Sequence, residues 1–477
     1  MKRDLIRNVG AVMHKSLSEM TLQELWELFP IQLTEHKECW KDWYLEERMF
    51  LLSFLPKTVR IYHIGSTAIQ GIWAKPIVDI LVEAPIKKHK TIKNLLMQNC
   101  YVCMAQNETQ LAIVDGVSGY YYDFPTLTFG QITDSEFPFG ARRISYLLSR
   151  FLAEAPQSQS ISWSKIGDVR VWDGLDFTSA DGAPDNVVSH LADHQELYVF
   201  GETTTQILVA DANGFANSPN SSMQQGCAAA FSPASIDNSV MWLGRDELGQ
   251  GVIWQTRGGA TPVRVSNHGV EYAIAQYARI DDAIAYAYQQ EGHLFYVITF
   301  PTGMATWVYD VASQAWHERA YMVPTTGELT RHRSNCHAMF NGRHIVGDWQ
   351  NGKLYELDLN AYTDDGDAIL RLRACPVISQ LQRRMVFKEL QVDIQAGSPL
   401  AIGPGSNPVG MLRYSDDSGH TWSNRSTATL GKIGEYWARC RFFRLGSGRN
   451  RVFEFSVSDP VPVVILGAYL DAVAGAW

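Results

Sequence analysis

The chain has 477 residues, of which 46% are hydrophobic and 19% charged, and its formal net charge is −9. This length allows several domains with large buried cores, and no apolar run approaches the length of a membrane span. The N-terminal stretch lacks the sustained apolar region of a signal peptide, and seven cysteines in so long a chain do not indicate a disulfide framework. We therefore expect a protein that folds in a reducing cytoplasm, without a helical membrane anchor.

The charges are divided unevenly along the chain. Residues 1–104 contain 14 lysines and arginines and 11 acidic residues, whereas the remaining 373 residues contain 27 and 39, a net charge of −12. Ten of the lysines lie in residues 1–104, and only four lie in the rest, where arginine replaces lysine. Because one fold has no physical reason to change its cation at a single point, we expect two parts of different origin that meet near Met104.

The first 104 residues predict a small α+β segment. Thr21 and Glu24 have the spacing of a capping box, and Thr34 is placed to cap a longer helix that ends near Leu55. The residues that follow predict strands over 59–64 and 77–82 and a helix over 87–98. This order of helix, strand, turn, strand and helix is typical of an α+β fold.

From residue 105 to residue 360 the sequence predicts many short strands. They are rich in Val, Ile, Tyr, Phe, Trp and Thr, and Asp115-Gly116, Asn341-Gly342 and Asn351-Gly352 are signals for tight hairpins. The predicted strands include 111–114, 119–124, 196–201, 204–210, 239–243, 251–256, 261–266, 294–300 and 306–311. Between Asn186 and Leu359 there is almost no helical periodicity, so we expect a β-propeller or a closed array of small antiparallel sheets.

Residues 361–477 predict a further β-rich domain. Strands are expected over 385–394, 410–414, 439–445, 452–457 and 461–469, with tight turns between them. The pattern fits a β-sandwich or a last pair of propeller blades equally well. The predicted fold class is therefore mainly β: a propeller-like array with a β-rich C-terminal domain, preceded by a truncated α+β segment.

Residues 61–83 carry a specific motif. The sequence HIGST at 63–67, followed by KPIVDILVE at 75–83, resembles the GrpB family of the nucleotidyltransferase superfamily. The resemblance implies that Gly65 and Ser66 lie against nucleotide phosphates and that carboxylates hold a divalent metal, with Asp79 at the first carboxylate position. Mg²⁺ and a nucleotide are the cofactors of this segment only if it is active.

The second carboxylate position departs from the family pattern. Leu81 stands where many relatives have Asp, and Glu83 lies on the same side of the strand as Asp79 but farther along. The alternative is that Asp79 is an ordinary residue at a strand end and binds no metal. We favour this alternative, because the motif stops near residue 104, before the later strand that would complete the site.

Several cysteines and histidines have spacings that can suggest metal or redox chemistry. Cys100 and Cys103 form a lone C-x-x-C without a second pair or a thioredoxin-like context. The remaining candidates are His190, His194, Cys336, His337 and His344. We interpret all of these residues as packing or surface residues, and we predict no metal site.

Residues 415–422 resemble the Asp-box, a hairpin motif of sialidase-type propellers and other β-proteins. The matching positions are Ser415, Asp417, Gly419, Thr421 and Trp422. The motif's role is local, because the Asp and Ser side chains bond to the turn backbone and Gly takes an unusual φ. A glycosidase would also need a catalytic carboxylate pair, and no spacing of acids singles one out.

From about residue 105 to the C-terminus the sequence resembles the packaged-DNA stabilisation proteins of short-tailed phages, also called tail accessory factors or tail hubs. Long segments carry the resemblance and come in family order: 111–123, 183–213, 226–254, 281–310 and 331–359. The resemblance implies a propeller-like subunit that forms a homo-oligomeric ring between the portal with its tail-tube adaptor and the tail needle. It also implies that this ring closes the channel and contains the DNA without sequence-specific binding.

We therefore expect a structural virion protein of the phage tail, present in the host cytoplasm during assembly, without a cofactor or an enzymatic role. The alternative is a GrpB-like, metal-dependent nucleotidyltransferase fused to a propeller that binds a partner. A glycan-binding propeller, suggested by the Asp-box, is the third hypothesis.

Overall fold

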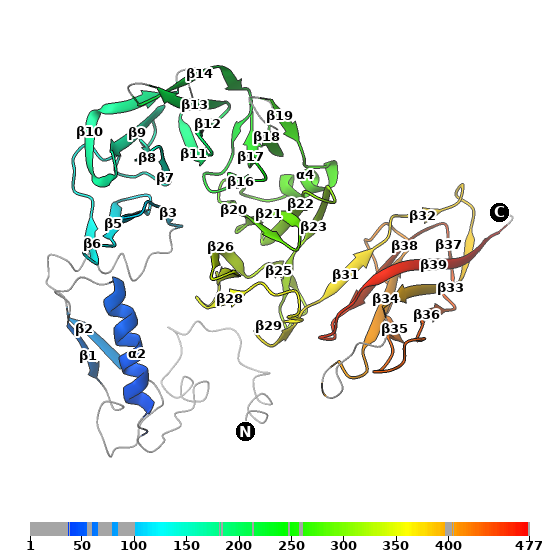
Figure 1. Ribbon diagram of the computed structural model, residues 1–477. Helices are drawn as coiled ribbons and strands as arrows, with labels where there is room; N and C mark the ends of the chain where they lie inside the picture. Colours follow the sequence, from blue (N-terminus) through cyan, green and yellow to red (C-terminus); the bar gives the residue numbers. More distant parts are fainter. Residues whose placement is uncertain are drawn as a thin grey trace, which may run out of the picture. The chain divides into compact units, whose positions relative to one another are not determined.

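The computed structural model describes residues 37, 39–54, 60–64, 79–83 and 101–475, with gaps at 181, 183–184, 212–213, 247–248, 257–260, 396–402 and 404 (Figure 1). The chain divides into two compact units. The first consists of Met1–Tyr101 with Tyr122–Gln131, and the second of Val102–Tyr121 with Ile132–Trp477.

In the N-terminal unit the structure describes one helix and a strand pair. Helix α2 (Cys39–Phe54) is followed by β1 (Arg60–Ile64), which pairs antiparallel with β2 (Asp79–Glu83). Tyr44 of the helix donates a hydrogen bond from its hydroxyl to the Ile61 carbonyl at 2.8 Å and stacks on His63. The order of helix and two strands confirms the α+β prediction for this stretch, whereas the predicted capping box and the helix over 87–98 lie outside the described residues.

Six antiparallel sheets follow in chain order. The first consists of β3 (Cys103–Gln106), β4 (Gln110–Val114), β5 (Gly119–Asp123) and β6 (Thr128–Gln131). The second consists of β7 (Ile144–Leu147), β8 (Arg150–Glu154), β9 (Ser160–Lys165) and β10 (Asp168–Ser179). The third consists of β11 (Val187–Asp193), β12 (Glu196–Gly201), β13 (Thr205–Asp211) and β14 (Gly214–Met223).

The fourth to sixth sheets repeat this meander with small variations. The fourth contains β15 (Gly226–Cys227), β16 (Ala234–Ile236), β17 (Ser239–Arg245), β18 (Gln250–Thr256) and β19 (Pro262–Arg264). The fifth contains β20 (Ile284–Gln290), β21 (His293–Phe300), β22 (Ala305–Asp310) and β23 (Ala315–Glu318). The sixth contains β26 (Ser334–Phe340), β27 (Arg343–Asp348) and β28 (Leu354–Glu356), and two short hairpins flank it: β24 (Ala320–Met322) with β25 (Leu329–Arg331), and β29 (Thr363–Asp364) with β30 (Asp367–Ala368).

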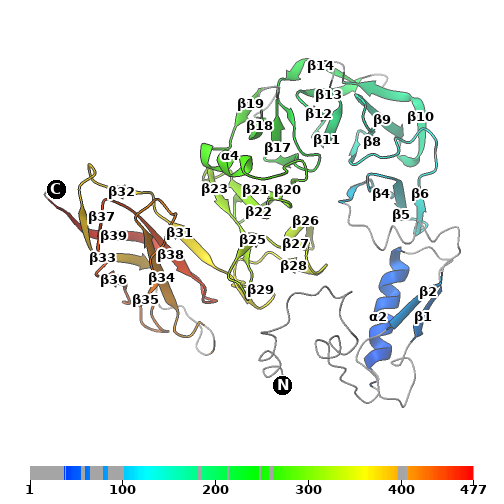
Figure 2. The same cartoon turned by 180° about the vertical axis from the view of Figure 1, so that it is seen from behind.

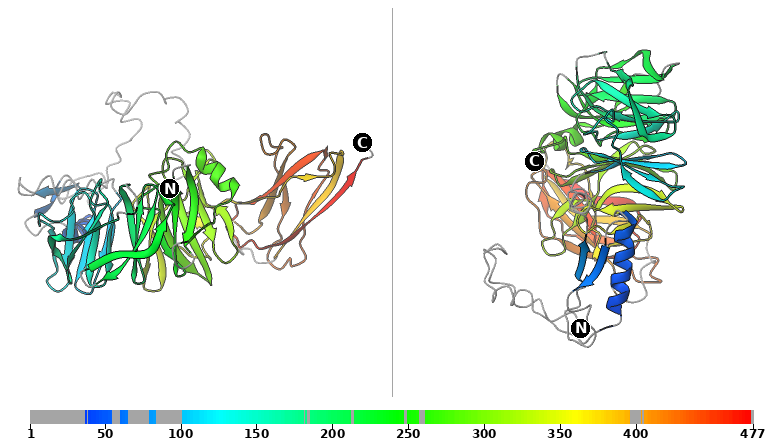
Figure 3. Two further views of the ribbon diagram at one scale, coloured as in Figure 1. Left: turned by 90° about the horizontal axis from the view of Figure 1, so that it is seen from above. Right: turned by 90° about the vertical axis from the view of Figure 1, so that its left-hand side faces the viewer.

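Neighbouring sheets pack through their first strands, except that β16 and not β15 makes the contacts of the fourth sheet. The strand contacts run from β3 to β7, β7 to β11, β11 to β16, β16 to β20 and β20 to β26, and the same succession can be followed from behind in Figure 2. Buried apolar clusters fill the spaces between successive sheets, as Phe151 and Trp172 do with Ala112 of the first sheet. Face-to-face packing of meander sheets with their first strands innermost is the architecture of a β-propeller, and Figure 3 shows the strands of these sheets side by side.

The structure corrects one expectation for this region. A short helix, α4 (His268–Ala275), lies between the fourth and fifth sheets, where the sequence predicted almost no helix. Asn267 caps it by accepting a hydrogen bond from the Val270 amide, and Val270 and Ile274 are buried against the fourth sheet. The helix was missed because eight residues span only two turns, too few to show a helical period.

Residues after 370 form a separate two-layer structure. One sheet contains β31 (Arg371–Ala374), β32 (Ile378–Ser379), β34 (Val409–Ser415), β35 (Ser426–Thr429) and β38 (Asn450–Val457). The other contains β33 (Met385–Ile394), β36 (Cys440–Phe443), β37 (Ser447–Gly448) and β39 (Ile465–Ala474). A single apolar cluster that includes Phe387, Phe442 and Phe455 lies between them. Of the two predicted alternatives, the C-terminal domain is therefore the β-sandwich.

Candidate assembly and hairpin sites

The predicted nucleotidyltransferase residues are only partly within the described structure. Gly65 and Ser66 lie outside the described residues. Asp79 and Glu83 occupy the two ends of β2, where they pair with Ile64 and Arg60 of β1. Four residues of strand separate their Cα atoms by about 13 Å. In the part of the chain that the structure describes, no group of three or more His, Cys, Asp or Glu side chains is arranged to hold a metal ion.

The five Asp-box residues meet in one turn that follows β34. Asp417 accepts hydrogen bonds from the Thr421 amide at 2.8 Å, the Thr421 hydroxyl at 2.6 Å and the Ser415 hydroxyl at 2.7 Å. Ser415 in turn accepts from the Gly419 amide at 2.8 Å, and Gly419 has a φ of +98°. Hydrogen bonds from Thr421 and Ser415 hold the pKa of Asp417 well below its usual range. All of these bonds satisfy the turn itself, so the arrangement stabilises a hairpin and offers no group for catalysis.

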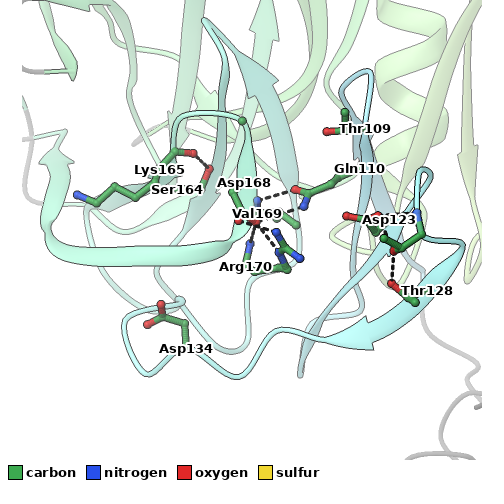
Figure 4. Close-up of polar contacts among 12 residues, drawn as sticks. Thr109, Gln110, Asp123, Thr128, Asp134, Ser164, Lys165, Asp168, Val169 and Arg170 are labelled. Carbon is green, nitrogen blue, oxygen red and sulfur yellow. Dashed lines mark hydrogen bonds and ion pairs between the residues drawn. The ribbon is translucent and has the colours of Figure 1, made fainter.

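A polar contact joins the first and second propeller sheets (Figure 4). The Gln110 side chain is only 3% exposed and reaches from β4 to the start of β10. Its amide nitrogen donates to Asp168 at 3.2 Å, and its carbonyl oxygen accepts from the Val169 amide at 2.9 Å. This residue therefore satisfies buried polar groups of two sheets at once.

We expect Gln110→Ala to destabilise the packing of the first sheet on the second. The variant leaves the buried Val169 amide without its acceptor, which costs about 1–3 kcal/mol. Hydrogen exchange of the full chain, followed by mass spectrometry of peptides over β4 and β10, measures the change. Glu108→Ala, at an exposed position two residues away, is the control and should leave exchange unchanged.

Asp168 makes a pH-dependent contribution to the stability of the same contact between the first and second sheets. Hydrogen bonds from the Arg170 side chain are the largest cause that lowers the pKa of Asp168 to about 2. Because the folded pKa lies below the unfolded value of about 3.9, the stabilisation is present above pH 4 and is lost as the pH falls toward 2.

The comparison of wild type with Asp168→Asn tests this pH dependence. The stability difference between them, followed by urea unfolding, should be full at pH 6 and should shrink between pH 4 and pH 2. A difference that stays constant over this range would show that the carboxylate charge contributes nothing to the contact.

A buried carboxylate joins the second and third sheets. Glu154, at the end of β8, is 2% exposed and accepts hydrogen bonds from the backbone amides of Arg142 and Arg143 at 2.7 and 2.9 Å. The fully buried His190 of β11 places Nδ1 3.2 Å from Glu154 Oε2, within ion-pair distance but without hydrogen-bond geometry. His190 is thus a core residue, as predicted, while His194 lies in the exposed turn after β11.

Residues 230–232, which precede β16, connect the third, fourth and fifth sheets through their backbone carbonyl groups. The Ala230 carbonyl accepts a hydrogen bond from the buried Ser189 hydroxyl of the third sheet at 2.7 Å. Phe231 forms a β-bridge with Ile284 of the fifth sheet, and the Ser232 carbonyl accepts from the Tyr296 hydroxyl at 2.8 Å. Backbone carbonyls leave no signal in a sequence, so this connection was not predicted.

An ion network lies beside a cavity of about 460 Å³ at the sixth sheet, and two of its residues, Arg333 and Asp365, line the cavity. Arg333 lies 3.5 Å from Asp348, 3.8 Å from Asp365 and 3.4 Å from Asp367, and its guanidinium covers the ring of Tyr321. These contacts tie the β24–β25 and β29–β30 hairpins to the sixth sheet.

The neighbouring histidine is held neutral. Burial, together with the charges of Arg319 and Arg333, lowers the pKa of His332 to about 3.

His337 and His344 face one another across β26 and β27, with ring nitrogens 3.0 Å apart, and His337 stacks on Tyr286 of the fifth sheet. Cys103 contacts the backbone of Ile144 in the second sheet, and Cys100 lies outside the described residues. These contacts are packing contacts.

Together, the described residues form a propeller and a sandwich, and polar contacts join neighbouring sheets of the propeller. Two family models identify the particular family: one described as Bacteriophage P22 Gp10, beta-propeller, matches residues 90–362, and one described as Bacteriophage P22 Gp10, beta-sandwich, matches residues 371–473. The chain belongs to the Bacteriophage P22 Gp10 family, and it is a structural phage protein of the DNA-stabilisation type and a virion component.

A third family model, described as GrpB protein, matches residues 30–117. UPF0157 protein SCO7215 of Streptomyces coelicolor is 43% identical over 56 residues, which are 12% of this chain and 30% of that protein. Glutamate-rich protein GrpB of Alkalihalophilus pseudofirmus is 47% identical over 51 residues, which are 10% and 29% of the two chains. The chain thus spans less than a third of the length of these curated relatives. Both resemblances seen in the sequence are confirmed.

Among solved structures, the N-terminal domain of Nup159 is 10% identical, with 53% of this chain and 73% of that chain covered and a TM-score of 0.34. An exo-beta-1,3-galactanase from Phanerochaete chrysosporium is 9% identical, with 78% and 96% covered and a TM-score of 0.29. In the described part of the chain, no helix is both long and apolar enough to cross a membrane.

Proposed function

We propose that this chain is a tail hub: a subunit of a ring below the portal and tail-tube adaptor that closes the DNA channel and holds the tail needle. The observation that supports the proposal most strongly is the order of the two Gp10 matches, propeller and then sandwich, each on a domain with that fold. In this proposal the mechanism is geometric, because a ring of rigid propellers blocks the channel and needs neither cofactor nor catalysis.

The charge of the region supports containment of DNA without binding to it. Residues 105–477 carry a net charge of −12, whereas proteins that bind DNA by counterion release present clustered cations to phosphates. We therefore expect no measurable binding of the purified chain to duplex DNA at physiological salt, as followed by fluorescence anisotropy.

Electron microscopy of the chain mixed with a cognate portal–adaptor complex tests the assembly. The proposal predicts ring density directly below the adaptor. Complexes without such density, at chain concentrations well above those of the portal, would count against a tail hub.

A second function is favoured by the GrpB match at residues 30–117. In this alternative, Gly65, Ser66, Asp79 and Glu83 belong to a nucleotidyltransferase site that uses Mg²⁺ and a nucleotide. Turnover of NTPs with Mg²⁺ by wild type and by Asp79→Ala distinguishes the two functions, and equal background rates would eliminate the transferase.

A further inference from the structure

The loop that joins β35 to β36 of the sandwich (Figure 1) carries large apolar side chains that are exposed to solvent. We call residues 431–439 the aromatic loop. Trp437 is 93% exposed, Tyr436 69% and Ile433 62%. Burying a large aromatic side chain is strongly favourable, and adjacent exposed apolar side chains on a soluble protein mark interaction sites. The loop therefore has the composition of a binding element.

The aromatic loop is held in one shape by its own backbone. The Glu435 amide donates to the Lys432 carbonyl at 2.9 Å, and the Glu435 carboxylate accepts from the Lys432 amide at 2.9 Å. The Ala438 amide donates to the Glu435 carbonyl at 3.2 Å, which closes a second turn.

The base of the loop is fixed as well. Leu430 and Cys440 on either side are buried in the sandwich core. A Cβ on Gly431, whose φ is +93°, would lie 2.6 Å from the Ala438 side chain, so only glycine fits there. A loop ordered in advance loses little conformational entropy on binding, which favours a tight contact through few side chains.

The charges around the aromatic side chains indicate the partner. Lys432 and Arg439 are exposed, and neither forms an ion pair with any residue that the structure describes. Glu435 is the one acidic residue of the loop, so the loop carries a net charge of +1. The body that carries the loop is acidic, with a net charge of −12 over residues 105–477. A cationic, aromatic protrusion on an acidic protein is complementary to the surface of another copy of the same protein.

We propose that the aromatic loop docks onto a second copy of this chain and anchors the ring. The inference rests on the proposed tail-hub function, because the ring requires contacts between copies. A single protruding loop meets a different surface on its neighbour, so the contact is head-to-tail, the kind that closes rings of more than two subunits. Trp437 is the anchor, since buried tryptophans dominate the binding energy of protein interfaces.

Sedimentation velocity of the full chain over a range of concentrations tests the proposal. Trp437→Ala should weaken self-association about thirty-fold, the effect of losing one interface anchor. Lys432→Glu should weaken it less, and its defect should shrink at high salt. Tyr272→Ala, which removes a similarly exposed aromatic residue from α4 of the propeller, is the matched control and should assemble like wild type. Equal melting temperatures show that all variants are folded.

The possible results distinguish an error in the proposed loop contact from an error in the proposed ring. If wild type and Trp437→Ala assemble equally, the loop contact is wrong and the tail hub stands. If Trp437→Ala assembles normally but loses binding to vesicles of anionic phospholipid, the loop contacts a membrane and the proposal is again wrong. If wild type stays monomeric at every concentration and forms no ring on the portal–adaptor complex, both proposals fail.

Discussion

Arg451→Ala is expected to destabilise the C-terminal sandwich by about 3–5 kcal/mol, the cost of emptying a packed, buried site and leaving the Leu445 carbonyl without its donor. Arg451 is 1% exposed. Two of its guanidinium nitrogens donate to Asp416 at 2.7 Å each, and the third donates to the Leu445 carbonyl. The guanidinium also lies 3.9 Å from the ring centre of Tyr414 and 4.4 Å from that of Phe387. One side chain therefore connects both sheets of the sandwich with the Asp-box turn.

Hydrogen exchange of the full chain measures this effect without requiring the whole protein to unfold in one step. Protection of β34 and β38 should fall by the predicted free energy, while the propeller strands stay unchanged. Arg449→Ala is the control, because Arg449 is exposed and makes only a 3.3 Å hydrogen bond to a backbone carbonyl. Equal protection of β34 in wild type and Arg451→Ala would show that the arginine is not needed.

Glu154→Ala should destabilise the second propeller sheet, where it contacts the third, by about 3–5 kcal/mol. The alanine removes the acceptor of the Arg142 and Arg143 amides at a site where Glu154 is 2% exposed, at about 1–3 kcal/mol for each unsatisfied group. Glu154→Gln keeps one acceptor oxygen and should cost roughly half as much.

The readout is the exchange of amides in β7, β8 and β11. Glu108→Ala, at an exposed acid of the first sheet, controls for the loss of one negative charge. If Glu154→Ala and Glu154→Gln behave alike, the hydrogen bonds to the two amides are not the reason for the effect.

Two strands were predicted closely from the sequence. The predicted strand over 385–394 coincides with β33, and that over 196–201 coincides with β12. The last strand was expected over 461–469 but runs from Ile465 to Ala474. Pro460 and Pro462 explain the later start, because proline cannot donate a ladder hydrogen bond.

Sites made by distant residues were not predicted. The Asp-box residues were found because its bonds join positions only two to four residues apart. Arg451 pairs with a residue 35 positions away, and Glu154 approaches His190 in another sheet. One signal was available: Arg451 alternates with Phe453 and Phe455 on the buried face of β38, and a cation in such a position requires a buried partner.

The central claim is that this subunit retains packaged DNA, and nuclease protection tests it most directly. Phage heads that have packaged DNA but lack the subunit are mixed with the purified full chain and then treated with a nuclease. The tail-hub proposal predicts that the DNA becomes nuclease-resistant as the chain is added and that Trp437→Ala protects less well. DNA that stays fully sensitive at saturating amounts of folded chain would contradict the proposed function.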